Sequence, residues 1–294
     1  MPNLKAIRVR IASVKSTRQI TSAMKMVSAA KLRKAQDKIV RLRPYANKLH
    51  DILVNLSQSL AESQVENIYA REGAPENILI VVVTSNRGLC GAFNSNVIKE
   101  ARRIVAEDYL DQYKKGKVSF LTIGKNGFDN LRKQKFSIAA EQNDLLNDLT
   151  FERTVAVAEK VMQAFTTGEY DRVELVYNHF KNAAVQQLTR EVFLPVESVK
   201  EEVKGSANAD YIYEPGKEEI IRELIPKSLK IQFYKAVLDS FVAENGARMT
   251  AMHKATDNAT TMISELTLQY NKARQASITN QILEVVSGAE ALKG

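Results

Sequence analysis

The sequence has 294 residues, of which 45% are hydrophobic and 26% are charged, as in a soluble folded protein of one large or two modest domains. This composition excludes a disordered chain. The formal net charge is +8 and the pI is about 9.3. The charge is uneven, because residues 1–43 contain twelve Lys and Arg residues and a single acid, Asp37. A basic N-terminal segment predicts an acidic partner, such as nucleic acid, an acidic protein loop or anionic lipid.

The N-terminal residues 3–57 have the spacing of a long coiled-coil helix, with Asn3 as its N-cap. Apolar residues recur at steps of three and four at Leu4, Ile7, Ile11 and Val14, and again from Leu32 to Leu60. Between the two runs, the same register holds polar residues from Arg18 to Ser28, while Ile20, Met24 and Val27 lie off it. The pattern predicts one helix with an altered phase in the middle and a bend or lost hydrogen bond at Pro44. A core helix of an ordinary bundle is the alternative.

The C-terminal residues from Pro226 to about Ser287 contain one glycine, Gly246, and predict a second helix of about 60 residues. A short helix over 218–224 is expected to precede Pro226, which would lie in the first turn. No stretch is apolar enough to span a membrane. The predicted seam is Met252, Ala255, Ala259, Met262, Leu266, Gln269, Ala273, Ala276, Asn280 and Leu283. Gln269 and Asn280 are expected to be buried polar residues that fix the register.

The two long helices are expected to pair antiparallel, with Arg18–Ser28 opposite Asn271–Gln281. Between them, strands at 78–84, 118–123, 136–140, 171–180 and 188–194 alternate with helices at 94–113, 126–133 and 151–167. This alternation predicts a mainly parallel sheet covered by helices, that is, a Rossmann-like α/β domain. The predicted parts are a helix over 1–60, an α/β domain over 76–196, a loop over 197–217 and a helix over 218–294.

Catalytic and metal-binding patterns are missing from the sequence. Ser85–Phe93 is a glycine-bearing turn after the first strand, but it lacks a dinucleotide or phosphate-loop fingerprint. Cys90 is the single cysteine, which excludes an intrachain disulfide, and no histidine lies near it in sequence. A buried structural thiol is the simpler interpretation. We expect no cofactor, no metal and no catalytic residue. A nucleic-acid-binding coiled coil and an enzyme built on the α/β domain remain alternatives.

Four segments resemble the gamma subunits of F-type rotary ATP synthases: IASVKSTRQITSAMKMVSAAKLRKAQ (11–36), GLCGAFN (88–94), ARMTAMHKATDNA (247–259) and LQYNKARQASITNQILEVVSGAEAL (268–292). The resemblance implies a non-catalytic rotor shaft, an antiparallel coiled coil inside a ring of three alpha and three beta subunits. It also implies an α/β domain near the epsilon subunit and the membrane c-ring. Proton-driven rotation would drive ATP synthesis in the beta sites. The implied location is peripheral, on the cytoplasmic face of a bacterial inner membrane.

The same resemblance implies roles for individual residues. Five residues match the family's contacts with the beta subunit: Met24, Lys25, Arg274, Gln275 and Thr279. A basic face is expected to meet acidic beta loops and includes Lys31, Arg33 and Lys34. The tip of the shaft, expected in an apolar bearing, includes Leu283, Val285 and Val286. A paired-cysteine regulatory insertion is absent, so thiol control of that kind is not expected.

Overall fold

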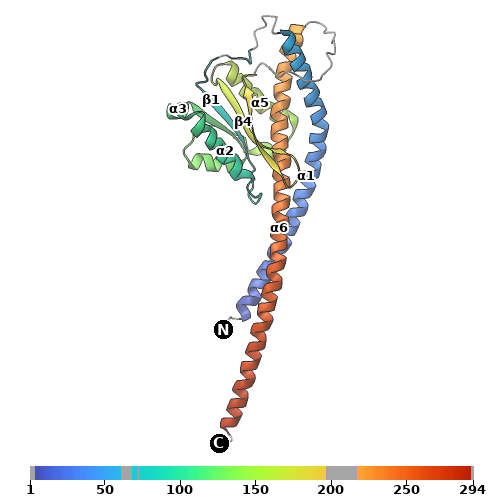
Figure 1. Ribbon diagram of the computed structural model, residues 1–294, viewed down its shortest axis with the longest axis vertical. Coiled ribbons are helices and arrows are strands. Elements are labelled where there is room, and N and C mark those ends of the chain that lie inside the picture. Colours follow the sequence, from blue (N-terminus) through green and yellow to red (C-terminus); the bar gives the residue numbers. More distant parts are fainter. Residues whose placement is uncertain (1–3, 61–67, 72, 197–216, 293–294) are drawn as a thin grey trace. The chain divides into compact units, whose positions relative to one another are not determined.

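A computed structural model describes residues 4–60, 68–71, 73–196 and 217–292 of a chain that begins and ends in long helices (Figure 1). Helix α1 spans Leu4–Leu60 and helix α6 spans Lys217–Ala291. The contacts between residues divide the chain into two units. One is Met1–Ala29 with Arg248–Gly294, and the other is Ala30–Ala247. Each unit therefore contains one part of α1 and one part of α6.

In the first unit, α1 and α6 run antiparallel. Arg8 Nη2 donates a hydrogen bond to the hydroxyl of Tyr270 at 2.8 Å. The hydroxyls of Thr21 and Thr256 lie 2.8 Å apart, and Lys25 Nζ lies 3.4 Å from His253 Nδ1. Residue numbers fall along α6 as they rise along α1, so the predicted antiparallel coiled coil is confirmed.

The predicted change of phase between Arg18 and Ser28 is wrong. The seam of α1 keeps its register, with Thr21 8% exposed and Ser28 3% exposed. These polar residues can be buried because the Thr21 hydroxyl bonds Thr256 and the Ser28 hydroxyl donates to the Met24 carbonyl at 2.8 Å. Ile20 and Val27, which are both 57% exposed, point away from the seam.

The predicted seam of α6 is only partly right. Met252, Ala259 and Leu266, which are seven positions apart, are buried as expected, whereas Ala273 and Asn280, which continue this spacing, are only half-buried. Of the intervening positions, Met262 is 41% exposed and Gln269 is also exposed. Tyr270 takes the place expected for Gln269, because its hydroxyl reaches Arg8 while its ring is half-buried. Neighbouring helix positions differ by about 100°, so either of two adjacent residues can complete a seam.

The expectation that Arg18–Ser28 lies opposite Asn271–Gln281 is also wrong. Thr21 lies beside Thr256, and Lys25 lies beside His253. Tyr270 is already level with Arg8, close to Leu4, where the described part of α1 begins. The helices have unequal lengths, 57 and 75 residues, so a pairing counted back from both ends of the chain is misaligned.

The second unit contains a five-stranded sheet in the order β3-β2-β1-β4-β5. The strands are β1 Ile78–Val83, β2 Val118–Ile123, β3 Ile138–Glu141, β4 Arg172–Phe180 and β5 Gln186–Leu194. The first four strands run parallel and β5 is antiparallel to β4. Every residue of β1 is buried, as its continuous apolar sequence predicts. The predicted mainly parallel, Rossmann-like sheet is therefore confirmed.

Side chains of β4 alternate between two faces of this sheet. On one face, Val176 packs in a core with α2 (Phe93–Glu107), and the Asn178 side chain donates to the Phe93 carbonyl at the start of α2. On the other face, His179 contacts Asp239 of α6. The sheet is therefore covered by α2 on one face and by α6 on the other (Figure 1).

The remaining helices depart from the expected bounds in two places. The predicted helix 94–113 is two helices, α2 and α3 (Leu110–Lys114), because Tyr109 leaves the helix to bury its ring. The predicted separate helix 218–224 is the start of α6, which contains Pro226 in its interior. A proline removes one backbone donor but does not end a helix whose next turns are buried, as at Leu229 and Phe233. Helix α1 likewise runs through Pro44.

The other elements are α4 (Lys125–Lys133), the 3₁₀ helix η1 (Asn143–Leu146) and α5 (Phe151–Thr166). The predicted loop 197–217 falls almost wholly outside the described residues, and the predicted division into four parts stays a prediction. Among the helices in the described ranges, none is both long and apolar enough to cross a membrane.

Candidate partner surface and the buried charges that support it

The predicted beta-contact residues of α1 lie at the edge of the helix pair. Lys25 is half-buried beside His253, and Met24 is half-buried one position earlier. The exposed apolar residues of this region are instead Ile20, Met26 and Val27, at 57%, 65% and 57% exposure. Ile20 and Val27 are seven positions apart and so share one face of the helix. Exposed apolar side chains that share one helix face are candidates for contact with a partner.

The basic face of α1 is present where the sequence placed it. Lys31, Arg33 and Lys34 are all exposed. The seam residues Leu32 and Ala35, 6% and 4% exposed, alternate with them and hold this part of α1 in the second unit. Since the apolar neighbours fix the rotation of the helix, the three cations point outward together.

The predicted contact residues of α6 lie far from those of α1. Arg274, Gln275 and Thr279 are exposed, and the Thr279 hydroxyl donates to the Gln275 carbonyl at 3.0 Å. Lys25 lies beside His253, and Arg274 is about 30 Å further along α6 at 1.5 Å per residue. The structure therefore does not bring the two groups of predicted contacts together.

The predicted tip residues are fully available to a partner. Leu283, Val285 and Val286 are 57%, 72% and 51% exposed, and Ile282 is 57% exposed. At about 100° per residue, these four positions lie within about half of the helix circumference. An apolar partner surface on that side of the helix would cover them.

Asp239 of α6 is a buried charge that the sequence reasoning missed. Its side chain is 0% exposed. One carboxylate oxygen lies 3.0 Å from His179 Nδ1 of β4, and the other accepts from Arg43 Nη2 of α1 at 3.2 Å. Arg43 also donates to the Phe180 carbonyl at 3.3 Å. The signal was visible in the sequence, because AVLDSFVA places one acid inside an apolar run (236–243).

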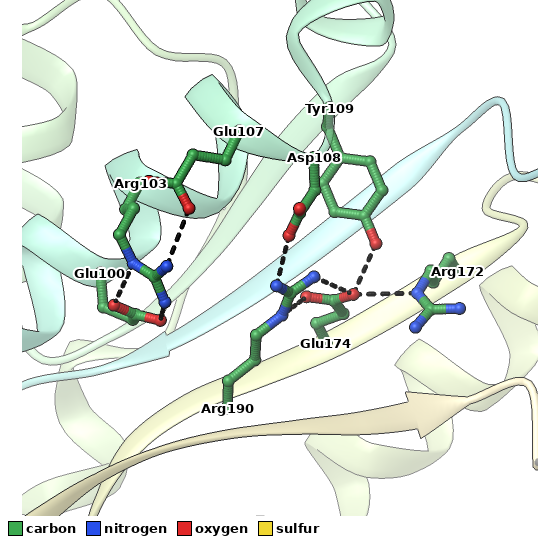
Figure 2. Close-up of polar contacts among 8 residues, drawn as sticks. All are labelled: Glu100, Arg103, Glu107, Asp108, Tyr109, Arg172, Glu174 and Arg190. Carbon is green, nitrogen blue, oxygen red and sulfur yellow. Dashed lines mark hydrogen bonds and ion pairs between the residues drawn. The ribbon is translucent and has the colours of Figure 1, made fainter.

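A second buried acid, Glu174, lies on the opposite face of β4 and is also 0% exposed (Figure 2). The Tyr109 hydroxyl donates to Glu174 at 2.5 Å, and Arg172 Nε donates at 2.9 Å. Arg190 of β5 donates through Nε at 2.7 Å and through Nη2 at 2.9 Å, and it also pairs with Asp108. The carboxylate thus ties β4, β5 and the junction of α2 with α3.

These contacts shift the proton affinity of the groups involved. Burial alone would raise the pKa of Glu174, but the hydrogen bonds from Arg190, Tyr109 and Arg172 outweigh it and lower that pKa. Burial, together with the hydrogen bond to Glu174, raises the pKa of Tyr109 to about 12. The cluster therefore holds a charged carboxylate beside a neutral phenol. The neighbouring Arg103 bonds Glu100 and Glu107 on the exposed surface of α2 (Figure 2).

The glycine-bearing turn after β1 is filled by its own side chains. The Ser85 backbone donates to Asn94 Oδ1 at 2.9 Å, and Asn94 Nδ2 donates to the Ser85 hydroxyl and to Cys90 Sγ at 2.8 and 3.3 Å. Cys90 is 2% exposed, as the structural interpretation predicts. A Cβ at Gly124 would lie 2.2 Å from the Thr84 carbonyl oxygen, so the neighbouring turn is also tightly packed. In the described residues, no group of three His, Cys, Asp or Glu side chains could hold a metal ion.

Comparison with known families assigns the class of this fold. The sequence model described as ATP synthase matches residues 3–292. The ATP synthase gamma chain of Cytophaga hutchinsonii is 54% identical, with 99% of each chain covered. That of Flavobacterium johnsoniae is 56% identical, and that of Chlorobaculum tepidum is 43% identical, both over 100% of each chain. The chain therefore belongs to the ATP synthase gamma-chain family.

Solved structures share the fold. The central stalk of the Tetrahymena thermophila mitochondrial ATP synthase is 26% identical with a TM-score of 0.59, and the match covers 80% of this chain and 99% of that one. A chain from the Euglena gracilis mitochondrial ATP synthase is 22% identical with a TM-score of 0.67, covering 98% and 94%. The long terminal helices and the five-stranded sheet are thus those of a rotor stalk.

Proposed function

We propose that this chain is the central rotor shaft of an F-type ATP synthase and couples proton-driven rotation of a membrane c-ring to ATP synthesis in the beta subunits. The observation that carries the proposal is an antiparallel helix pair whose exposed surface is uneven, in a chain related over its full length to gamma chains. Acidic surfaces of neighbouring subunits in such a complex would account for the basic N-terminal segment without nucleic acid.

The proposed mechanism depends on the unevenness of the surface. Around α1, apolar side chains such as Val27 are exposed at some positions and cations such as Lys31 at others. Three beta subunits around such a shaft would each meet a different surface. Different contact energies shift each subunit toward a different conformation, and rotation moves these preferences from one subunit to the next. ATP would be made on the beta subunits, and this chain would be non-catalytic.

The proposed partners are the alpha and beta subunits, the epsilon subunit and the c-ring. Membrane association would occur only through the complex, at the cytoplasmic face of a bacterial inner membrane. The charge distribution supports an acidic partner for α1, because twelve of the chain's 42 Lys and Arg residues lie in residues 1–43 beside one acid.

The residue roles inferred from the family are part of the proposal. Met24 and Lys25 would contact one part of the beta subunit. Arg274, Gln275 and Thr279 would contact a second part about 30 Å away along the shaft, given the pairing of α1 with α6. Exposed Leu283, Val285 and Val286 would sit in an apolar bearing.

Co-purification tests this proposal. The tagged chain, expressed in its native cells, should retain alpha and beta subunits at high salt and show ATP hydrolysis. Retention of DNA with salt-dependent affinity, and no alpha or beta subunits, would instead support the nucleic-acid-binding alternative.

A further inference from the structure

The β4–β5 hairpin is attached to α6 at three positions that are seven residues apart. Gln232 Nε2 donates to Glu191 of β5 at 2.7 Å. Asp239 contacts His179 of β4 at 3.0 Å. At Gly246, an added Cβ would lie 3.3 Å from the Cα of Ala183, in the turn between the strands. Since positions seven apart share one face of a helix, the hairpin lies along about two heptads of α6.

The middle attachment differs from the other two because it contains a charged side chain, that of Asp239, which contacts two other elements of the fold. Glu191 also accepts from Tyr177 of β4 at 2.9 Å, so its contacts stay between the hairpin and α6. At Gly246, the contact described with Ala183 is close packing. Asp239 instead joins β4 of the sheet, α6 and, through Arg43, α1. Among the contacts described at these three positions, those of Asp239 join the sheet to both long helices through polar groups.

The physical character of the Asp239 contact suits it to holding an orientation. A fully buried carboxylate is costly unless its hydrogen-bonding partners remain in place, so this contact adds a directional requirement to that of packing. A small rotation of the sheet against α6 would move His179 away from Asp239. The free energy of the charge cluster therefore opposes such a rotation more steeply than packing alone would.

Building on the proposed rotor function, we propose that Asp239 is the positioning residue that transmits turning force from the sheet to the paired helices. His179 is its contact on the sheet side and Arg43 its contact on α1. Loss of the Asp239 charge would leave the helix pair able to turn, because the proposed contacts with the beta subunits are made by other residues. Force applied through the sheet would then be transmitted with slip.

The test compares Asp239→Asn with Glu223→Gln in the complete membrane-bound complex. Glu223 is a matched control, since it lies on the same helix and its 68% exposed side chain bonds only Lys227 of that helix among the contacts described. For Asp239→Asn, we expect ATP synthesis driven by a proton gradient to fall at least fivefold. ATP hydrolysis by the detached catalytic part should stay within twofold. Glu223→Gln should change neither rate.

A second variant separates force transmission from folding. Ala183→Cys and Gly246→Cys, added to Asp239→Asn, place two cysteines where an added Cβ at position 246 would lie 3.3 Å from the Cα of residue 183, and a disulfide between them would tie the hairpin to α6 again. We expect oxidation to restore synthesis to within twofold of the unmodified complex and reduction to remove the gain. The inference is overturned if Asp239→Asn matches Glu223→Gln, if hydrolysis and synthesis fall by the same factor, or if the oxidised bridge restores nothing. An unmodified chain that is absent from the complex would contradict the proposed function itself.

Discussion

The hydroxyls of Thr21 and Thr256 lie 2.8 Å apart between two antiparallel helices. Each hydroxyl also lies within hydrogen-bond distance of a carbonyl of its own helix, Thr21 of the Arg18 carbonyl at 3.1 Å and Thr256 of the Met252 carbonyl at 2.8 Å. Each hydroxyl has one hydrogen to donate, so the threonine that donates across the seam gives up the bond to its own carbonyl, while the other keeps it. A polar pair in a seam fixes the register at which the helices meet.

Replacing one or both of these threonines with valine tests this relationship. Each single Thr→Val change should cost about 0.5–1 kcal/mol, because the remaining hydroxyl keeps the bond to its own helix. The double change should cost no more than either single one, since two apolar groups of the same shape then face each other. Urea unfolding of the four chains measures this, and a double variant that loses more than the two single changes together would contradict the account.

Exposed apolar residues on α1 should matter for association and not for folding. Ile20→Gln with Val27→Gln should leave the free energy of unfolding within about 0.5 kcal/mol, because both side chains face solvent. Retention of alpha and beta subunits should weaken. As a contrast, Leu32→Ala in the buried seam should cost about 2–5 kcal/mol. An equal loss of stability from the Ile20 and Val27 changes would show that they lie in a core.

The Glu174 cluster should make the free energy of unfolding depend on pH in the acidic range. Its pKa is lowered in the folded state, so its stabilising contribution is present above the unfolded value of about 4.3 and is lost as pH falls through the folded value. Glu174→Gln should cost about 3 kcal/mol at pH 7, because Arg172 and Arg190 lose their shared carboxylate. The difference between the two proteins should narrow below about pH 4. If the two proteins differ by a constant free energy of unfolding from pH 7 to below pH 4, a charged Glu174 does not stabilise the fold.

The backbone conformation of Lys135 predicts a substitution that stabilises the protein. Lys135 has φ of 65° at the end of α4, a left-handed conformation that suits glycine. Lys135→Gly should raise the free energy of unfolding by up to about 1 kcal/mol. Gly124→Ala should act oppositely, because φ is 103° and the new Cβ would meet the Thr84 carbonyl oxygen. Thermal unfolding of both variants checks the signs, and destabilisation by Lys135→Gly would refute the strain argument.

Arg274 and Gln275 should act on catalysis and not on folding. Both are exposed on α6, so replacing both with alanine should leave unfolding unchanged within about 0.5 kcal/mol. Multisite ATP hydrolysis and its coupling to proton movement should fall. An unchanged reconstituted complex would remove these two residues from the proposed contact surface.

Much of the fold follows from the sequence because spacing and burial are linked. The apolar run of β1 predicts a buried strand, and the steps of three and four in α1 predict a helix whether it belongs to a coiled coil or to an ordinary bundle. The α6 seam did not, since adjacent positions such as Gln269 and Tyr270 can both be turned toward a partner, and only the tertiary contact with Arg8 decides. The prediction of a phase change in the middle of α1 was wrong for a similar reason. Exposed Ile20 and Val27 looked like a displaced seam, while buried Thr21 and Ser28 looked like surface.

The site was less predictable than the fold. Lys31, Arg33 and Lys34 could be placed outward from helix periodicity alone. Asp239 and Glu174 could not be paired with His179, Arg43 or Arg190, because those partners come from other elements. An acid inside a buried strand or an apolar helical run was the available signal. It indicates that a partner is needed but not which one.

The most direct test of the rotor account is observation of rotation in single complexes. A bead attached to a cysteine introduced at exposed Lys114, on α3, would report movement of the sheet while the alpha and beta subunits are fixed to a surface. The account predicts stepwise rotation in one direction when ATP is added. A bead that only fluctuates about one position, in complexes that hydrolyse ATP at the normal rate, would contradict it.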